Sequence, residues 1–499
     1  MNKKIVPVII LSGVIFQACS LTSAADRNGP DLMEEMKDSI VYLEVSSYGY
    51  SRSEPWKHER LSENWACACA VGEYDVITTA DSVVNLAFLR ALRYGQNEFV
   101  GATLKVVDYD TNLCLIRLDP NALSTPLKPL TFSEDYEKGA EVSFYWLSSK
   151  NQLYNGRGYL DRASVEPTQV SFGQRLCYIA ANTSQRTSRG EVYCVGSTPI
   201  GIAHLSSEEK ESGLIPAETI NRFLKAADSE NYQGFGEVGF VLSELLDPAM
   251  RSYLKMSSSM ADGAYVVDVD NLGTGCESLK KGDVILSIDG HTLDPHGRFM
   301  HPKYQRLSFS HLITSKAVGE NVRFELWRDG QKMEIEKEVT NFDVSQMLVP
   351  YHEYDRQSEY IITAGFVLQK LTREYLKVFG DDMEGKSPPH LYHYYRDSAF
   401  KPSPERQDIV ILSYVLWGPF NLGYTRLGRM VVSKVNGMTI RSIQDILTAQ
   451  KLNPDSKYDV IEFELDNPTV VIPRAQLPAA NQYIQRRYGI EKLSNIHDP

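Results

Sequence analysis

The chain has 499 residues and a formal net charge of −12, with 42% hydrophobic and 23% charged residues. This length predicts about three domains, and the composition excludes collagen, a coiled coil, a polytopic membrane protein and wholesale disorder. An acidic chain without a basic tract is a poor nucleic-acid ligand, so we expect no nucleic-acid partner.

The first 25 residues are typical of an export signal. Lys3 and Lys4 precede an apolar run, Ile5–Ala18, that is too short to span a membrane comfortably. Two cleavage sites stay open. Residues 16–19 resemble a bacterial lipobox that would leave Cys19 lipidated, and small residues just beyond suit ordinary signal peptidase. We expect an exported protein of the bacterial cell envelope, in the periplasm, whose only route to the membrane is a lipid on that cysteine.

Seven cysteines are present, and in an exported protein they would meet an oxidising compartment. Cys177 and Cys194 lie in strand-like runs on either side of a loop, so we expect them to face each other across a hairpin. Cys114 and Cys276 are expected to be buried free thiols. No cysteine spacing fits a zinc site, and we expect neither a metal nor a cofactor.

From residue 31 to residue 228, short strand-like runs alternate with turns. The runs Phe99–Val107 and Leu113–Leu118, for example, flank the turn-rich segment Asp108–Asn112. Their number and spacing predict an all-β barrel or double barrel. The segment 216–226 predicts a closing helix with its apolar residues on one face.

A degenerate internal repeat fills the rest of the chain. The run GFVLSEL at 239–245 recurs as GFVLQKL at 365–371, and VILSIDG at 284–290 is echoed by VVSKVNG at 431–437. The runs at 284–290 and 431–437 are each followed by apolar residues at helical spacing. The repeat therefore predicts two related units in tandem, each a small sheet with a helix.

Residues 282–290, GDVILSIDG, resemble the strand and turn of a PDZ domain. With the barrel-like region before it, the chain is similar to the HtrA/Deg family of trypsin-like serine proteases, and most to plant-type Deg proteases with an unusual second PDZ domain. The resemblance implies a mainly β chain. A trypsin-like double β-barrel at 31–228 would be followed by two PDZ-like α+β domains at 234–341 and 358–492, the last with an insertion. It also implies a homo-oligomer, a trimer or a multiple of trimers.

The resemblance assigns the three positions of the family's Ser-His-Asp triad. In the motif ITTADSVV the His position is occupied by Asp81, and in NLCLI the Asp position is occupied by Asn112. In RTSRG the nucleophile survives as Ser188, but the glycine two residues before it is Arg186.

These replacements affect proton transfer first. A serine hydroxyl needs an adjacent base, and imidazole serves near neutral pH, whereas a carboxylate such as Asp81 ordinarily titrates near ~4. Asn112 has no charge to stabilise an imidazolium, and Arg186 puts a Cβ where backbone N–H groups form the oxyanion hole. We expect an inactive protease fold in which Asp81 and Asn112 hydrogen-bond to each other. His58 and His204 are the region's other histidines, and neither is expected to act as the base.

PDZ domains bind an extended peptide as an added strand at a sheet edge. The resemblance assigns this role in the first unit to a loop and to a helix that would close the groove. Glu237 would repel an incoming carboxylate unless it points away. The assigned residues are Glu237, Val238, Gly239, Phe240, Phe309, Leu312 and Ile313.

Together these features predict an exported HtrA/Deg-like pseudoprotease that binds peptides or unfolded envelope proteins. Two alternatives stay open. One is an active serine endopeptidase with a site rebuilt around Ser188, and the other is an oligomeric structural scaffold.

Overall fold

The computed structural model describes residues 29–57, 61–168, 170–183, 189–206, 210–228, 232–257, 259–380, 382–465 and 468–497. The predicted export signal, including Cys19, lies outside these ranges. Within them, no helix combines the length and the apolar character needed to cross a bilayer.

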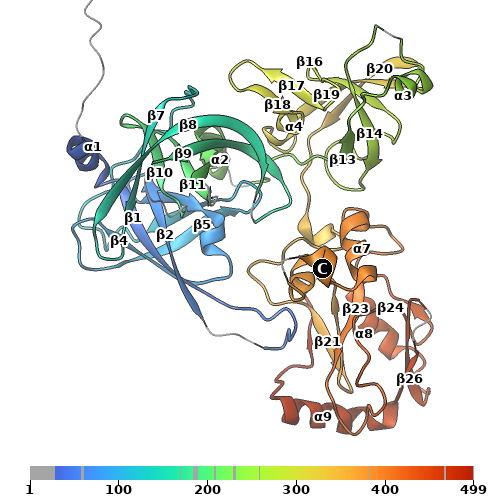
Figure 1. Cartoon of the computed structure of the whole chain (residues 1–499). Helices are drawn as coiled ribbons and strands as arrows, with labels where there is room; N and C mark the ends of the chain where they lie inside the picture. The colour runs from blue at the N-terminus through green and yellow to red at the C-terminus, as the bar shows by residue number, and fades with distance from the viewer. Residues whose placement is uncertain are drawn as a thin grey trace, which may run out of the picture.

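Two closed six-stranded barrels form the N-terminal half of the chain (Figure 1). Closure leaves no unpaired sheet edge, and it confirms the predicted double barrel. The strand orders are β1-β2-β3-β6-β5-β4 and β10-β11-β12-β9-β8-β7. The strands are β1 (Ile40–Ser47), β2 (Ser62–Ala70), β3 (Asp75–Thr79), β4 (Leu86–Arg93), β5 (Val100–Asp108), β6 (Leu113–Leu118), β7 (Glu141–Leu147), β8 (Leu153–Pro167), β9 (Gln174–Asn182), β10 (Val192–Val195), β11 (Thr198–Ser206) and β12 (Glu211–Pro216).

Three short helices accompany the barrels. They are α1 (Gly29–Met36), the 3₁₀ helix η1 (Ala80–Val83) and α2 (Ala217–Ala227). The helix α2 is the predicted closing helix, and Ile220 and Phe223 on its inner face are fully buried.

The order of strands in the second barrel shows that one prediction is wrong. Cys177 lies on β9 and Cys194 on β10, and two strands separate β9 from β10 in either direction around the barrel. The two cysteines therefore cannot face each other across a hairpin, and both are buried free thiols. Cys114 is a buried free thiol as predicted, whereas the free Cys276 is only partly buried.

Two further sheets follow, and the repeated sequence falls on equivalent strands of each. The first has the order β13-β14-β15-β19-β20, with β16 on β15 and a separate β17-β18 hairpin. Its elements, with the linker helix η2, are β13 (Phe240–Ser243), α3 (Pro248–Tyr253), β14 (Ala264–Val269), β15 (Val284–Ile288), β16 (His291–Thr292), β17 (Arg298–His301), β18 (Gln305–Ser308), α4 (His311–Thr314), β19 (Asn321–Arg328), β20 (Gln331–Glu338) and η2 (Val344–Gln346).

The second sheet has the order β27-β26-β24-β23-β22-β21-β28, with β25 on β24. The run GFVL lies on β13 in the first sheet and on β22 in this one, so these two strands correspond. Its elements are β21 (Tyr360–Thr363), β22 (Phe366–Lys370), α5 (Arg373–Lys377), α6 (Met383–Lys386), α7 (Pro389–Ser398), β23 (Val410–Val415), β24 (Met430–Val435), β25 (Met438–Thr439), α8 (Ile443–Lys451), β26 (Tyr458–Phe463), β27 (Val470–Pro473), η3 (Arg474–Gln476), α9 (Leu477–Tyr488) and β28 (Ser494–Asn495).

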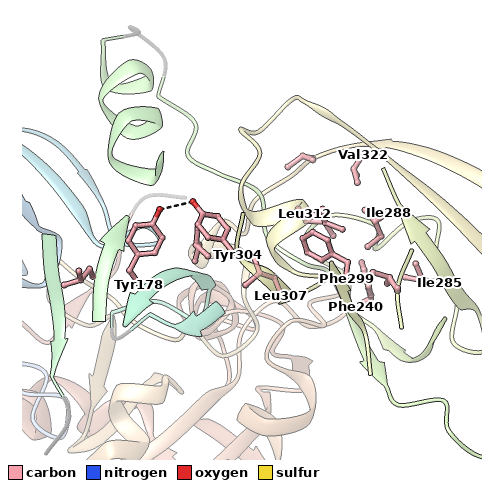
Figure 2. Packing of buried hydrophobic residues seen from close by; sticks show 14 of the residues in the cluster. Tyr178, Phe240, Ile285, Ile288, Phe299, Tyr304, Leu307, Leu312 and Val322 are labelled. Atoms are coloured by element: carbon pink, nitrogen blue, oxygen red, sulfur yellow. Dashed lines mark hydrogen bonds between the residues drawn. The ribbon is translucent and has the colours of Figure 1, made fainter. Parts of the chain in front are cut away.

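The first of these units packs onto the second barrel through a shared core (Figure 2). Tyr304, in the turn between β17 and β18, lies with its hydroxyl 2.8 Å from that of Tyr178 on β9. The Tyr304 hydroxyl donates to Glu218 at 2.7 Å. Both tyrosine rings are buried, and their hydroxyls satisfy each other in the apolar surroundings. This junction is therefore continuous core.

The second unit is joined to the barrels by the loop between β1 and β2, which extends toward β21 (Figure 1). Arg52 in this loop donates to Ser358 Oγ at 2.9 Å and to the Glu353 carbonyl at 2.8 Å. Four residues on, Trp56 is only 9% exposed and packs among Tyr360 and Ile362 of the second unit. A side chain of the first barrel thus forms part of the second unit's core.

We expect Trp56→Ala to release the second unit from the barrel, because truncating a buried Trp costs about 3–5 kcal/mol. Hydrogen exchange of the β21 and β22 amides measures this, and their protection should fall sharply. Phe88→Ala, which removes an aromatic ring that is 54% exposed, is the matched control and should change protection little. Unchanged protection in Trp56→Ala would contradict the account of this junction.

Candidate functional site

The His-equivalent and Asp-equivalent positions of the barrel lie side by side. Asp81 is on η1, directly after β3, and Asn112 directly precedes β6. Because β3 and β6 pair with Thr79 opposite Leu113, the two residues meet. The backbone N–H of Asp81 donates to Asn112 Oδ1 at 2.8 Å. The predicted hydrogen bond between them therefore forms, through the main chain of Asp81.

The chain around Asn112 shows why this residue type suits the position. Its φ is +56°, in the left-handed region, where Asn is tolerated better than most residues. Its carbonyl also accepts from the Ala80 N–H at 3.1 Å. Asn112 thus holds the start of η1 through both its side chain and its main chain, and it is fully buried.

The electrostatics of the pair are those of an enclosed acid beside a neutral amide. Burial raises the pKa of Asp81, against hydrogen bonds involving Thr79, Ser82 and Asn112. Asp81 Oδ1 and Asn112 Nδ2 make no hydrogen bond with any described residue. An imidazole in this place could accept a proton at one ring nitrogen while its other nitrogen bonds to a carboxylate. The Asp81 carboxyl group cannot do this, and Asn112 carries no charge that would stabilise a protonated base.

The nucleophile loop is described only on its C-terminal side. Ser188 and Arg186 lie in the segment 184–188, outside the described residues. At Gly190, φ is +90° and a Cβ would lie 2.2 Å from the Cys67 carbonyl oxygen, so only glycine fits. The N–H groups of Arg189 and Gly190 are already used, by the Glu191 carboxylate at 2.7 Å and by the Ala203 carbonyl at 3.1 Å.

Of the two alternative histidines, the structure describes only His204. His58 lies outside the described residues. His204, on β11, is buried rather than on a barrel edge, with Nε2 3.6 Å from Cys177 Sγ. Burial lowers the pKa of His204 to about 4, so its imidazole is neutral and enclosed at physiological pH.

The segment between the two C-terminal units passes across this face of the barrel. Asp355 and Asn85 exchange two hydrogen bonds of 2.7 Å, each side chain accepting from the other's backbone N–H. The Tyr109 hydroxyl donates to Asp355 at 2.5 Å. Asn85 is four residues after Asp81, and Tyr109 is three before Asn112. These hydrogen bonds therefore attach Asp355 to the two loops that carry Asp81 and Asn112.

Aromatic packing extends this contact. The Tyr354 ring lies 4.5 Å from that of Tyr109 and 4.1 Å from that of His352, and its hydroxyl donates to the Val170 carbonyl at 3.0 Å. Burial raises the pKa of Tyr354, and the charge of Asp81 adds to the effect. We call residues 352–355 the cover segment, because they contact the two loops that carry Asp81 and Asn112 and a third loop at Val170.

The predicted peptide-binding loop of the first unit points its charge away from the groove. Glu237 is buried in an ion pair with Arg175 on β9. Burial raises the pKa of Glu237 to about 7, with Arg175 opposing. The N–H groups of Glu237 and Gly239 donate to the carbonyls of Thr340 and Thr274 at 2.9 and 3.0 Å. These two N–H groups are therefore not available to a terminal carboxylate.

The other predicted groove residues are partly as expected. Val238 bridges to Thr274, and Phe240 stacks on Phe309 with ring centres 5.5 Å apart. Only His311–Thr314 is helical, so Phe309 precedes the helix instead of lying on it. Leu312 and Ile313 are buried in the shared core, because this short helix packs against β9.

The two units differ at the sheet edge where a peptide would add. In the first unit β13 is the edge strand. In the second unit the corresponding strand, β22, is covered by β21, which pairs with it antiparallel from Tyr360 opposite Gln369 to Thr363 opposite Phe366. The chain thus occupies this edge of the second unit itself and leaves the first unit's edge open.

Comparisons with known proteins agree with this architecture. Residues 349–495 match the family model of a PDZ domain. Protease Do-like 2, chloroplastic, of Arabidopsis thaliana is 28% identical over 92% of this chain and 75% of its own length. Protease Do-like 4, mitochondrial, of the same plant is 23% identical over 91% of this chain and 85% of its own. This chain is a homologue of the Deg/HtrA-like proteases.

The fold of this Deg homologue is as the resemblance implied, a mainly β chain with a trypsin-like double barrel followed by PDZ-like units. An HtrA-type protease, AlgW with decapeptide, aligns with a TM-score of 0.48 at 15% identity, over 62% of this chain and 98% of that one.

Two features of the Deg homologue were missed by sequence reasoning. Arg175 gives no local signal as the partner of Glu237, 62 residues away. The cover segment lies in what reads as a linker. Its aromatic run, Tyr351-His352-Glu353-Tyr354, was the available signal, because a linker exposed to water seldom carries so many rings.

We expect the buried His204 to destabilise the protein in acid. Its folded-state pKa is below the unfolded value of 6.5, so the unfolded chain takes up the proton first as pH falls. Stability should be lost between pH 6.5 and 4, by up to about 3 kcal/mol relative to His204→Gln. Urea unfolding of both proteins across this range measures it, and parallel pH profiles would contradict the buried, neutral imidazole.

Proposed function

We propose that this chain is a non-catalytic Deg homologue that binds extended peptide segments along the free edge of β13. The observation that supports the absence of catalysis is the pairing of Asp81 with Asn112. A serine hydroxyl needs a base whose pKa is near the working pH, and this pair offers a neutral amide and a carboxyl group.

The cover segment supports the same proposal, because it limits the access of a substrate to the candidate site. A substrate must lie across the loops that carry the triad-equivalent residues. Here Asp355 is bonded to Asn85 and Tyr109, and Tyr354 packs on the second of these. Catalysis would first require these contacts to break.

The second half rests on the contrast between β13 and β22. Peptides add to a sheet edge through main-chain hydrogen bonds, and β13 is such an edge, whereas β22 is covered by β21. Because the amides of Glu237 and Gly239 are already bonded, binding along the strand is favoured over capture of a chain terminus. Unfolded envelope proteins would supply such segments.

Two other functions have an observation in their favour. The Arabidopsis relatives are named proteases, which favours an endopeptidase built around Ser188. The covered edge of β22 favours a scaffold role for the second PDZ-like unit, within a homo-oligomer. Casein cleavage separates catalysis from binding, and peptide titration with the β13 variants separates binding from scaffolding.

We also propose export to the bacterial cell envelope, supported by Lys3, Lys4 and the apolar run after them. A lipid on Cys19 would anchor the chain. Labelling cells with palmitate tests this, since incorporation should disappear in Cys19→Ser. Retention of the intact N-terminus in the cytoplasm would contradict export.

We expect the purified chain to leave unfolded casein intact at neutral pH. Loss of a triad base lowers turnover by about 10⁶-fold, so the rate should equal that of Ser188→Ala. Casein cleavage by the parent protein that Ser188→Ala abolishes would show the rebuilt endopeptidase instead.

For peptide binding, neighbouring residues of β13 provide a variant and its control. Leu242 is partly buried beside the core, and Val241 is 48% exposed on the opposite face. Leu242→Asp should weaken peptide binding about tenfold or more, because burying an apolar side chain contributes about 1.5–3 kcal/mol. Val241→Asp should leave affinity unchanged. Fluorescence anisotropy with a peptide library measures both, and free and amidated C-termini should bind alike. Absence of saturable binding by the parent chain would favour the scaffold.

A further inference from the structure

The second PDZ-like unit contains a cavity of about 680 Å³ at a place that the proposed function does not use. It lies between the end of α6, the start of α7 and the loop that leads into β24. Its volume falls within the range of about 300–1,000 Å³ that is usual for ligand pockets. In the sheet order, β24 is separated from β22 by β23, and the edge strand β13 belongs to a different sheet.

Positive charge dominates the polar lining of this cavity. Lys386, Arg426 and Arg429 line it together with His390, and no described lining residue is acidic. None of the three cations forms an ion pair with a described residue. The chain as a whole is acidic, with a net charge of −12. Charges of both signs are ordinarily interspersed on a protein surface, so three cations around one cavity without a described acidic partner are unusual.

The nearest described carboxylate along the chain is already engaged. Glu464 immediately precedes the lining residue Leu465, but it pairs with Arg406 at 2.6 Å and accepts from the Tyr394 hydroxyl at 2.8 Å. Among the residues that the structure describes, no carboxylate compensates the three cations of the cavity.

One of the cations, Arg429, is held in place by its backbone and by a ring contact. His390 Nε2 donates to the Arg429 carbonyl at 2.7 Å, and the Arg429 N–H donates to the Leu412 carbonyl at 2.6 Å. The Arg429 guanidinium lies 4.9 Å from the centre of the Phe379 ring. Pre-positioned donors lose less conformational entropy when an anion binds.

The rest of the lining is apolar. Pro388 and Leu427 face the cavity with Leu465, which is 71% exposed. A small inorganic anion would leave this apolar surface wet. A ligand that carries carboxylates on an apolar frame, as an acidic peptide does, would cover it while meeting the cations.

We propose that this cavity binds an anionic peptide segment, in which apolar residues contact Leu427 and Leu465 and carboxylates contact Lys386, Arg426 and Arg429. The carboxylates would come from Asp or Glu side chains or from a chain terminus. The inference deepens the proposed function, since it adds a second contact for a polypeptide ligand. It uses different elements from the β13 edge, so each can fail without the other.

The test uses the full chain and a labelled peptide in which two Glu residues flank Phe-Leu on each side. A second peptide has Gln in place of every Glu, with either a free or an amidated C-terminus. The Glu peptide should bind more tightly than the amidated Gln peptide, and more weakly as salt rises. If the free C-terminus restores binding, the terminus is the source of the carboxylate, and if only Glu does, side chains are.

The double variant Arg426→Glu/Arg429→Glu should weaken binding about 100-fold, since each charge-assisted contact contributes about tenfold. Arg323→Glu/Lys332→Glu, on β19 and the edge strand β20 of the first unit, makes the same change in net charge and should have no effect. Leu242→Asp, which tests the β13 edge, should leave this binding intact. Loss of Glu-peptide binding only in Leu242→Asp would show that the peptide binds β13 and would overturn the inference.

Inorganic phosphate and vesicles containing phosphatidylserine are the remaining probes. Binding of either one in the absence of Glu-peptide binding would overturn the inference, because it would identify a general anion or a membrane surface as the ligand. Equal binding of the Glu and amidated Gln peptides would overturn it as well.

Discussion

The hydrogen bond from the Asp81 main chain to the Asn112 side chain constrains everything that the candidate site of the barrel can do. It requires a left-handed residue directly before β6 and a short helical turn directly after β3, and the antiparallel pairing of those two strands brings them together. In this arrangement the amide works as a structural brace. Burial raises the pKa of the Asp81 carboxyl group, but the neutral amide of Asn112 cannot stabilise a protonated base as a carboxylate at that position would.

The loops of the barrel also hold the C-terminal units of this chain. The loops after Asp81 and before Asn112 bind the cover segment through Asp355. The loop between β1 and β2 places Trp56 in the core of the second unit. Tyr304 and Glu237 join the first unit to β9. We propose that the β13 edge and the cationic cavity serve partners.

Local patterns in the sequence were enough for the architecture but not for the contacts between distant segments. The GFVL repeat fell on corresponding strands, β13 and β22, although the two copies differ in burial: Val241 of the first is exposed, and Val367 of the second is fully buried. The helix at 217–227 followed from its single apolar face. By contrast, Cys177 and Cys194 were misplaced because sequence does not reveal the order of strands around a closed barrel. The orientation of Glu237 depended on Arg175, and nothing local to either residue indicates the other. The sequence also did not indicate that β21 covers β22. A segment of this composition can be a strand or a linker, and only its pairing with a neighbouring strand distinguishes the two.

The central claim, that the Ser188 hydroxyl is not activated, is tested most directly by its reactivity toward a fluorophosphonate. The full chain would be incubated with the probe at neutral pH beside trypsin, and adducts located by mass spectrometry. The account predicts that trypsin is labelled while Ser188 is not, whatever the exposure of its loop. Stoichiometric labelling of Ser188, lost in Ser188→Ala, would show that some group does accept its proton and would contradict the account.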